Sequence, residues 1–104
     1  MNTVINKGMR GTWQAETFVP FKGEKQLQVS TFKNHRGNLV TVVKVVTVAK
    51  GLITYTPFSD YNTQADGTQD RCTKANVESQ HSKVLVEIEQ YREEAEKFYK
   101  EQSK

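Results

Sequence analysis

Covalent chemistry in this sequence could come from one thiol and two imidazoles. Cys72 would act as a nucleophile only with a base beside it, and the candidate bases are His35 and His81. The two histidines lie far apart in the sequence, and no third residue is placed to orient either of them as a base. We therefore expect a protein that is not an enzyme.

Residues that could ligate a metal are equally scattered. One cysteine and two histidines do not supply the four clustered ligands of a closed zinc site. The segment from Asp60 opens like an EF-hand loop, but Ala65 stands where that loop requires glycine and Arg71 where it requires a bidentate glutamate. We expect neither a metal ion nor a cofactor.

His81 falls in an apolar stripe of the C-terminal half, between Val77 and Val84. We interpret it as a hydrogen-bonded histidine at a packing surface. The alternative is a pH-sensitive contact in a dimer, because histidine titrates near neutrality.

Basic residues at turns, with aromatic residues nearby, are the best candidates for a binding site. Residues 1–50 carry eight Lys/Arg and two acids, a net charge of +6, whereas residues 51–104 carry seven Lys/Arg and ten acids, a net charge of −3. This split favours an anionic partner for the first half, although the two halves could instead dock on each other. A cationic groove with aromatic platforms binds single-stranded nucleic acids. The expected phosphate contacts are Lys22, Lys25, Lys33, Arg36 and Lys50, with Trp13 or Tyr55 stacking on bases.

The same residues have a simpler interpretation. Lysines at turns are ordinary solvated surface and protect sheet edges, and Trp13 and Tyr55 could belong to the core. Successive hairpins of a meander also point in opposite directions, which would place Arg36 and Lys50 at opposite ends of the sheet. A single concentrated basic patch does not follow from the sequence.

Alternation of apolar and polar residues predicts antiparallel strands in the first half of the chain. Thr12–Val19 and Gln26–Lys33 alternate with a period of two, and the valine-rich stretch Asn38–Val48 follows. Ala49–Gly51 is expected to be a three-residue hairpin loop, after which Leu52–Thr56 returns. These segments form the meander on which the rest of the interpretation depends.

The valine-rich stretch is apolar on both sides, with Lys44 as the exception. A strand with one solvated face would show a polar residue at every second position, and this one does not. It is therefore expected either to be covered on both faces or to bend so strongly that its ends belong to different layers. Lys44 would reach an edge or extend its ammonium past its own apolar stem.

The remaining residues predict a polar loop over 59–72 and an amphipathic helix over 73–102. About 28 helical residues at 1.5 Å each would span ~42 Å, which exceeds the length of the predicted strands. The helix should therefore overhang the sheet, so that its last turns fray or its seam packs on another copy. A homo-oligomer and a monomer are equally compatible with this pattern. The seam for an oligomer or partner is expected to consist of Val84, Ile88, Tyr91, Ala95 and Phe98.

Together these patterns predict an α+β fold in a single domain, residues 1–104. A strongly bent antiparallel sheet of three to five strands, such as a small SH3-like or OB-like barrel, spans 12–58 and precedes one long C-terminal helix. The alternative is a four-stranded sheet with the helix on one face. One cysteine, no apolar leader and no membrane span favour a cytoplasmic location.

Two function classes fit these features. The first is a small non-enzymatic module that binds nucleic acid through its basic loops and the aromatic residues of its sheet. The alternative is a protein–protein interaction module, such as an adaptor, regulator or inhibitor of the kind that phages and mobile elements encode. It would act through the C-terminal helix or a sheet edge.

Overall fold

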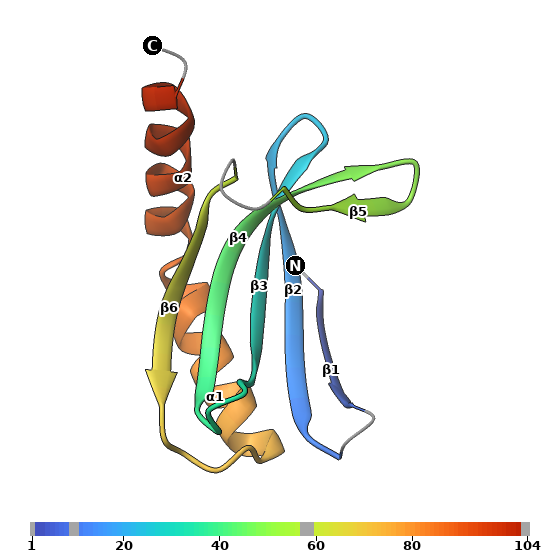
Figure 1. Ribbon diagram of the computed structural model, residues 1–104, viewed down its shortest axis with the longest axis vertical. Coiled ribbons are helices and arrows are strands. Elements are labelled where there is room, and N and C mark those ends of the chain that lie inside the picture. Colours follow the sequence, from blue (N-terminus) through green and yellow to red (C-terminus); the bar gives the residue numbers. More distant parts are fainter. Residues whose placement is uncertain (1, 9–10, 57–59, 103–104) are drawn as a thin grey trace.

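The computed structural model describes residues 2–8, 11–56 and 60–102, which form an antiparallel sheet followed by two helices (Figure 1). The helices are α1 (Lys74–Val86) and α2 (Ile88–Gln102). The α+β class and the strongly bent antiparallel sheet expected from the sequence are confirmed. Within the described residues the strands are β1 (Thr3–Lys7), β2 (Trp13–Lys22), β3 (Lys25–Lys33), β4 (Leu39–Ala49), β5 (Leu52–Thr54) and β6 (Asn62–Thr68).

Strand β4 is the central strand of the sheet and pairs with β3, β5 and β6. β1, β2, β3 and β4 follow one another as neighbours, and the far edge of β4 is shared by two further strands. β6 pairs with the first half of β4, over Leu39–Lys44, and β5 pairs with its end, over Thr47–Ala49. The end of β4 and β5 therefore leave the body of the protein as a projecting hairpin (Figure 1).

β4 bends strongly, as one of the two expectations had it, and part of each of its faces is buried. Val43 and Val45 point towards the helices and are 0% exposed, and Val46, on the opposite face, is also 0% exposed. Lys44 is half-buried, and its ammonium lies 4.9 Å from the centroid of the Tyr55 ring. The long apolar stem of this lysine thus lies along the sheet while its charge contacts an aromatic face.

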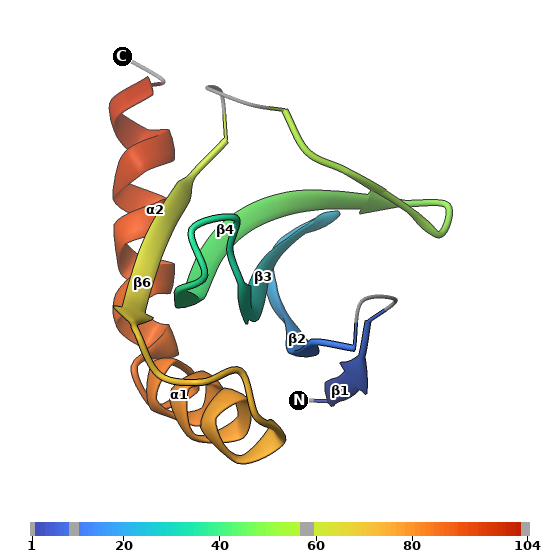
Figure 2. The same ribbon diagram turned by 60° about the horizontal axis from the view of Figure 1, so that its bottom comes forward.

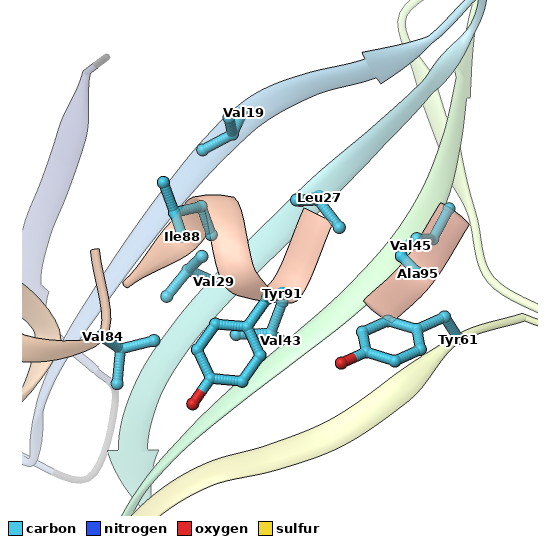
Figure 3. Packing of buried hydrophobic residues seen from close by; sticks show 10 residues of the cluster. All are labelled: Val19, Leu27, Val29, Val43, Val45, Tyr61, Val84, Ile88, Tyr91 and Ala95. Carbon is cyan, nitrogen blue, oxygen red and sulfur yellow. The ribbon is translucent and has the colours of Figure 1, made fainter. Parts of the chain in front are cut away.

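The helices cover one face of the curled sheet (Figure 2). The main core lies between the helices and the sheet. It combines the helix-facing side chains of β2, β3 and β4 with the inner faces of α1 and α2 (Figure 3). Burial of each Val or Leu side chain contributes about 1.5–3 kcal/mol to folding. The cluster consists of Val19, Leu27, Val29, Val43, Val45, Tyr61, Val84, Ile88, Tyr91 and Ala95.

This core corrects the expectation of a seam for another copy. Four of the five seam residues are buried in the core of the same chain, and the fifth, Phe98, packs against it. The Phe98 ring meets the Tyr61 ring at a centroid distance of 6.0 Å. The apolar stripe of the helices is therefore covered by their own sheet. The residues concerned are Val84, Ile88, Tyr91, Ala95 and Phe98.

The single long helix expected over 73–102 is wrong, because the helix breaks at Glu87. The start is as expected: Thr73 caps α1, with its Oγ1 accepting from the N–H of Asn76 at 3.1 Å. At Glu87 the backbone turns to φ −99° and ψ 15°, and its N–H bonds to the carbonyl of Val84 at 3.0 Å. The two helices therefore run in different directions (Figure 2), and the last turns of α2 extend past the end of β6 (Figure 1).

Two strands were missed, and the closed barrel is absent. β6 lies within the segment 59–72 expected to be a polar loop, and β1 lies before the predicted strands. Among the described strands nothing joins β1 to β6, so the sheet is an open half-barrel. The alternative of a sheet with helical cover on one face describes its layers better.

The tip of the projecting hairpin is a two-residue loop, one shorter than expected. β4 ends at Ala49 and β5 begins at Leu52. Lys50 and Gly51 both have positive φ, 54° and 77°, as a type I′ turn requires. The glycine takes this conformation without strain, whereas the lysine is held there against its preference.

Candidate functional site

The face of the sheet opposite the helices carries a hollow of about 580 Å³. Side chains from five strands line it, and they mix apolar, amide and charged groups. No described helix covers this face (Figure 2). The side chains that shape its chemistry are Val4 from β1, Glu16 from β2, Gln28 and Phe32 from β3, and Val42 and Lys44 from β4.

Polar groups in the hollow are held by contacts between strands. Gln28 Nε2 donates to Glu16 Oε2 at 3.0 Å, so the carboxylate is already engaged. At the far side Asn62 Nδ2 donates to the Tyr55 hydroxyl at 2.6 Å, and Lys44 covers the Tyr55 ring. The hollow therefore presents a positioned cation and amide groups, and the Tyr55 ring lies beside it in contact with Lys44 and Asn62.

Aromatic rings add to this face. Phe32 lines the hollow, and Phe18 pairs with Gln28 across β2 and β3, which places both side chains on the same face. Both phenylalanines are half-buried. Phe18, Phe32 and Lys44 were absent from the expected contact set, although strand parity alone could have placed them with Tyr55 on one face.

The basic residues expected to bind phosphate lie at both ends of the sheet. Lys22 and Lys25 flank the turn between β2 and β3, at the same end as Lys50 at the tip of the β4–β5 hairpin (Figure 1). Lys33 ends β3 at the opposite end, where Arg36 lies in the turn to β4. The structure does not bring the five together as one patch, and Lys44 lies between the two groups.

Lys25 is committed to an internal cluster. Its ammonium lies 3.4 Å from Asp60 Oδ1 and 4.8 Å from the centroid of the Tyr99 ring. The Tyr99 hydroxyl donates to the same carboxylate at 2.8 Å. Burial raises the pKa of Asp60, but the hydrogen bonds from Tyr99 and the Thr56 N–H and the charge of Lys25 outweigh it, so the pKa lies below its ordinary value. Lys25 is thus the least available of the five cations.

Trp13 lies on the helical side of the sheet. Its ring is contacted by two ammonium groups, with Lys7 Nζ 5.9 Å and Lys74 Nζ 5.7 Å from the centroid. Its carbonyl accepts from Cys72 Sγ at 3.1 Å. Trp13 and Tyr55 therefore belong to different faces and cannot form one stacking platform.

His81 is buried beneath α1, as the packing-surface interpretation expected. Its two ring nitrogens contact Thr17 Oγ1 at 2.7 Å and Thr31 Oγ1 at 2.8 Å. Burial lowers the pKa of His81 to about 4, so the imidazole is neutral at pH 7. The alternative of a titrating contact between two copies is wrong, because the ring is enclosed by its own chain.

Catalytic and metal-binding arrangements do not emerge within the described part of the chain. Cys72 contacts the Trp13 carbonyl, while both nitrogens of His81 contact threonines, so the thiol and the imidazole have separate partners. Among residues 2–8, 11–56 and 60–102 no group of three His, Cys, Asp or Glu side chains could hold a metal ion. None of the helices in this range is long and apolar enough to cross a membrane.

Charge is segregated between the two layers. In the described residues up to 56, seven Lys/Arg stand against the two acids Glu16 and Glu24, while residues 60–73, which include β6, add three acids and one arginine. Residues 74–102, which form the helices, carry seven acids against five Lys/Arg. An anion would therefore be attracted to the sheet and its turns and repelled from α2.

Comparisons with family models, curated proteins and solved structures find no match to this chain. The functional argument therefore depends on the chain's own residues.

Proposed function

We propose that this protein is a small non-enzymatic module that binds single-stranded nucleic acid on the uncovered face of its sheet. The observation that carries the proposal is the hollow on that face, whose wall includes Lys44 and Phe32, with the Tyr55 ring beside it in contact with Lys44. Stacking of a base on an aromatic ring contributes about 1–3 kcal/mol, and a lysine beside the ring can contact the adjoining phosphate.

The basic turns extend this site in both directions. Lys33 and Arg36 lie at one end of the sheet and Lys50 lies at the other, whereas Lys22 lines a separate hollow with residues of α2. A strand of nucleic acid laid along the face would pass from one group to the other with its bases towards the sheet. This arrangement favours a single strand, because a duplex keeps the faces of its bases stacked inside and offers only phosphates to the hollow.

The test is fluorescence anisotropy with labelled single- and double-stranded DNA and RNA, between about 50 and 200 mM salt. Lys44→Met removes the charge and keeps the apolar stem. We expect it to weaken single-strand binding and to reduce the salt slope by about one for the lost phosphate contact. Lys97→Met on α2 is the matched control and should bind like the wild type. Absence of wild-type binding at the lowest salt, or equal binding by Lys44→Met, would refute the proposal.

A protein-binding function is the second candidate, favoured by the projecting β4–β5 hairpin. Leu52 is 70% exposed and Ile53 is 51% exposed on this hairpin. Adjacent exposed apolar side chains on a projecting element are typical of contacts with another protein. Under this function Leu52→Lys would abolish capture of the partner while leaving oligonucleotide binding at the hollow unchanged.

We further propose a cytoplasmic location. It is supported by Cys72, which is a free thiol, and by the absence of any other cysteine in the sequence.

A further inference from the structure

The outer edge of β1 has no neighbouring strand among the described residues. Among the described strands β1 pairs only with β2, in continuous register over Thr3–Lys7, and four of its five residues are exposed. Thr3, Val4 and Ile5 are β-branched, and the strand contains no proline and no acid. An edge strand of this composition presents unpaired N–H and C=O groups that readily pair with another strand.

The other edge strands carry the protection that β1 lacks. β5 has only three residues. β6 is interrupted by a bulge, because Thr41 and Val42 pair with Asp66 and Gln64 and leave Ala65 as the extra residue. Short strands, bulges and charged residues all discourage pairing with a further strand. β1 has no bulge and only Lys7, at its end, as a charged residue, so Thr3–Asn6 is the stretch of edge most open to pairing.

We infer that β1 pairs antiparallel with β1 of a second copy of this chain about a two-fold axis, which joins the two sheets into one. About an axis perpendicular to the sheet, facing residues point to the same face, so Val4 can face Val4 and Thr3 can face Ile5. This pairing covers Val4, which is 59% exposed on the uncovered face. It is isologous, as most homodimer contacts are.

The charges of β1 are compatible with a second copy. Lys7 is its only charged residue and lies three residues from Val4. In the antiparallel pair the two Lys7 side chains are six positions apart, roughly 20 Å at about 3.4 Å per residue. That separation exceeds the Debye length of about 8 Å at physiological salt, so the two cations do not oppose pairing.

The contact is small, which sets its expected strength. In this register residues 2–6 of each copy pair, a span of about 17 Å along the strand. A single strand pair buries less than a standard stable interface, so the dimer should be in rapid, concentration-dependent exchange with the monomer.

Pairing would also complete the hollow. Val4 and Asn6 of β1 form its rim on this side. A second β1 beside them would continue the wall into the hollow of the other copy. If the proposed function holds, the dimer then offers one continuous face for a longer single strand.

The experiment measures mass by sedimentation equilibrium against protein concentration, without nucleic acid. The wild type should approach twice the chain mass of 11.9 kDa as concentration rises. Val4→Lys places two like charges opposite each other and should weaken association about tenfold or more. Leu52→Lys, which adds the same charge on the exposed hairpin, should leave association unchanged. A wild type that stays monomeric at its solubility limit, or equal weakening by both variants, overturns the inference.

Cross-linking tests the register. In a Cys72→Ser background, Val4→Cys should oxidise to a covalent dimer, because residues facing across a strand pair have Cβ atoms about 4.5–5.5 Å apart. Asn6→Cys lies on the same strand and face, but its two copies would be roughly 14 Å apart and should not cross-link. Cross-linking of both variants to the same extent would count against ordered pairing. Because these measurements contain no oligonucleotide, a failed binding assay with an intact dimer refutes the proposed function alone.

Discussion

Thr17 and His81 are joined by a contact of 2.7 Å between Oγ1 and Nε2, which ties β2 to α1 inside the core. On the other side of the ring, Nδ1 lies 2.8 Å from Thr31 Oγ1, and Thr31 continues to Thr41 at 2.7 Å. Thr17 continues to Thr3 on β1, also at 2.7 Å. One imidazole thus connects the helical layer to four strands through an unbroken chain of hydroxyl groups.

The first prediction is a loss of stability as pH falls towards 4. The pKa of His81 is lowered from 6.5 to about 4 in the folded protein, so the unfolded chain binds a proton more readily. The stabilisation is fully present above pH 6.5 and is lost progressively as the pH falls. Between pH 7 and pH 5 we expect about 2 kcal/mol less free energy of unfolding. Urea denaturation at the two pH values measures it.

His81→Gln is the control for this prediction. The variant should be less stable at pH 7, because buried hydroxyl groups lose their partner, but its stability should change little between pH 7 and pH 5. The pKa of Asp60 is lowered from 3.8, so that carboxylate titrates below this window and does not confuse the comparison. An equal pH dependence in both proteins would show that another group is responsible.

The second prediction concerns the tautomer of His81. Thr41 is fully buried, whereas Thr3 at the other end of the chain of hydroxyl groups is exposed. If every hydroxyl donates towards Thr3, the last proton reaches solvent and no donor is left unsatisfied in the core. This direction requires the hydrogen on Nε2, donating to Thr17, with Nδ1 accepting from Thr31.

Nitrogen-15 NMR of the imidazole distinguishes the two forms. We expect the shifts of the Nε2–H tautomer at pH 7, with slow exchange of that proton. The Nδ1–H tautomer would reverse the chain and leave the hydroxyl hydrogen of Thr41 pointing into the core. Thr3→Val should preserve the tautomer, because it removes only the solvent end of the chain.

The strands and their parity could be read from the sequence because burial imposes a period of two. Val43 and Val45 were placed on one face by that period, and the structure buries both. Strand β6 was not predicted because it consists mainly of polar residues. Its partner β4 is also distant in the sequence, so no local pattern indicates the pairing. The helix break at Glu87 was not expected, because residues 74–102 contain neither proline nor glycine to mark it.

The candidate site was harder to foresee for the same reason. Lys25 and Asp60 are 35 residues apart in the sequence, so no local pattern predicts their contact. Trp13 and Tyr55 lie on opposite faces of the sheet: Trp13 is paired with Lys7 of β1, whereas Tyr55 is in contact with Lys44 of β4. The placement of basic turns at opposite ends could be anticipated from hairpin geometry. The hollow between them required the three-dimensional arrangement.

The last prediction separates the two aromatic residues first considered for stacking. Tyr55 lies beneath Lys44 on the uncovered face, whereas Trp13 lies between Lys7 and Lys74 on the helical side. Tyr55→Leu should therefore weaken single-strand binding by about 1–3 kcal/mol, the worth of one stacked base. Trp13→Leu should leave binding unchanged and lower the thermal unfolding temperature, since its ring packs near Cys72 and the start of α1. Anisotropy titrations at one fixed salt concentration, with circular dichroism to verify folding, give both results. If Trp13→Leu lost binding while staying folded and Tyr55→Leu did not, the binding face would have to be moved to the helical side of the sheet.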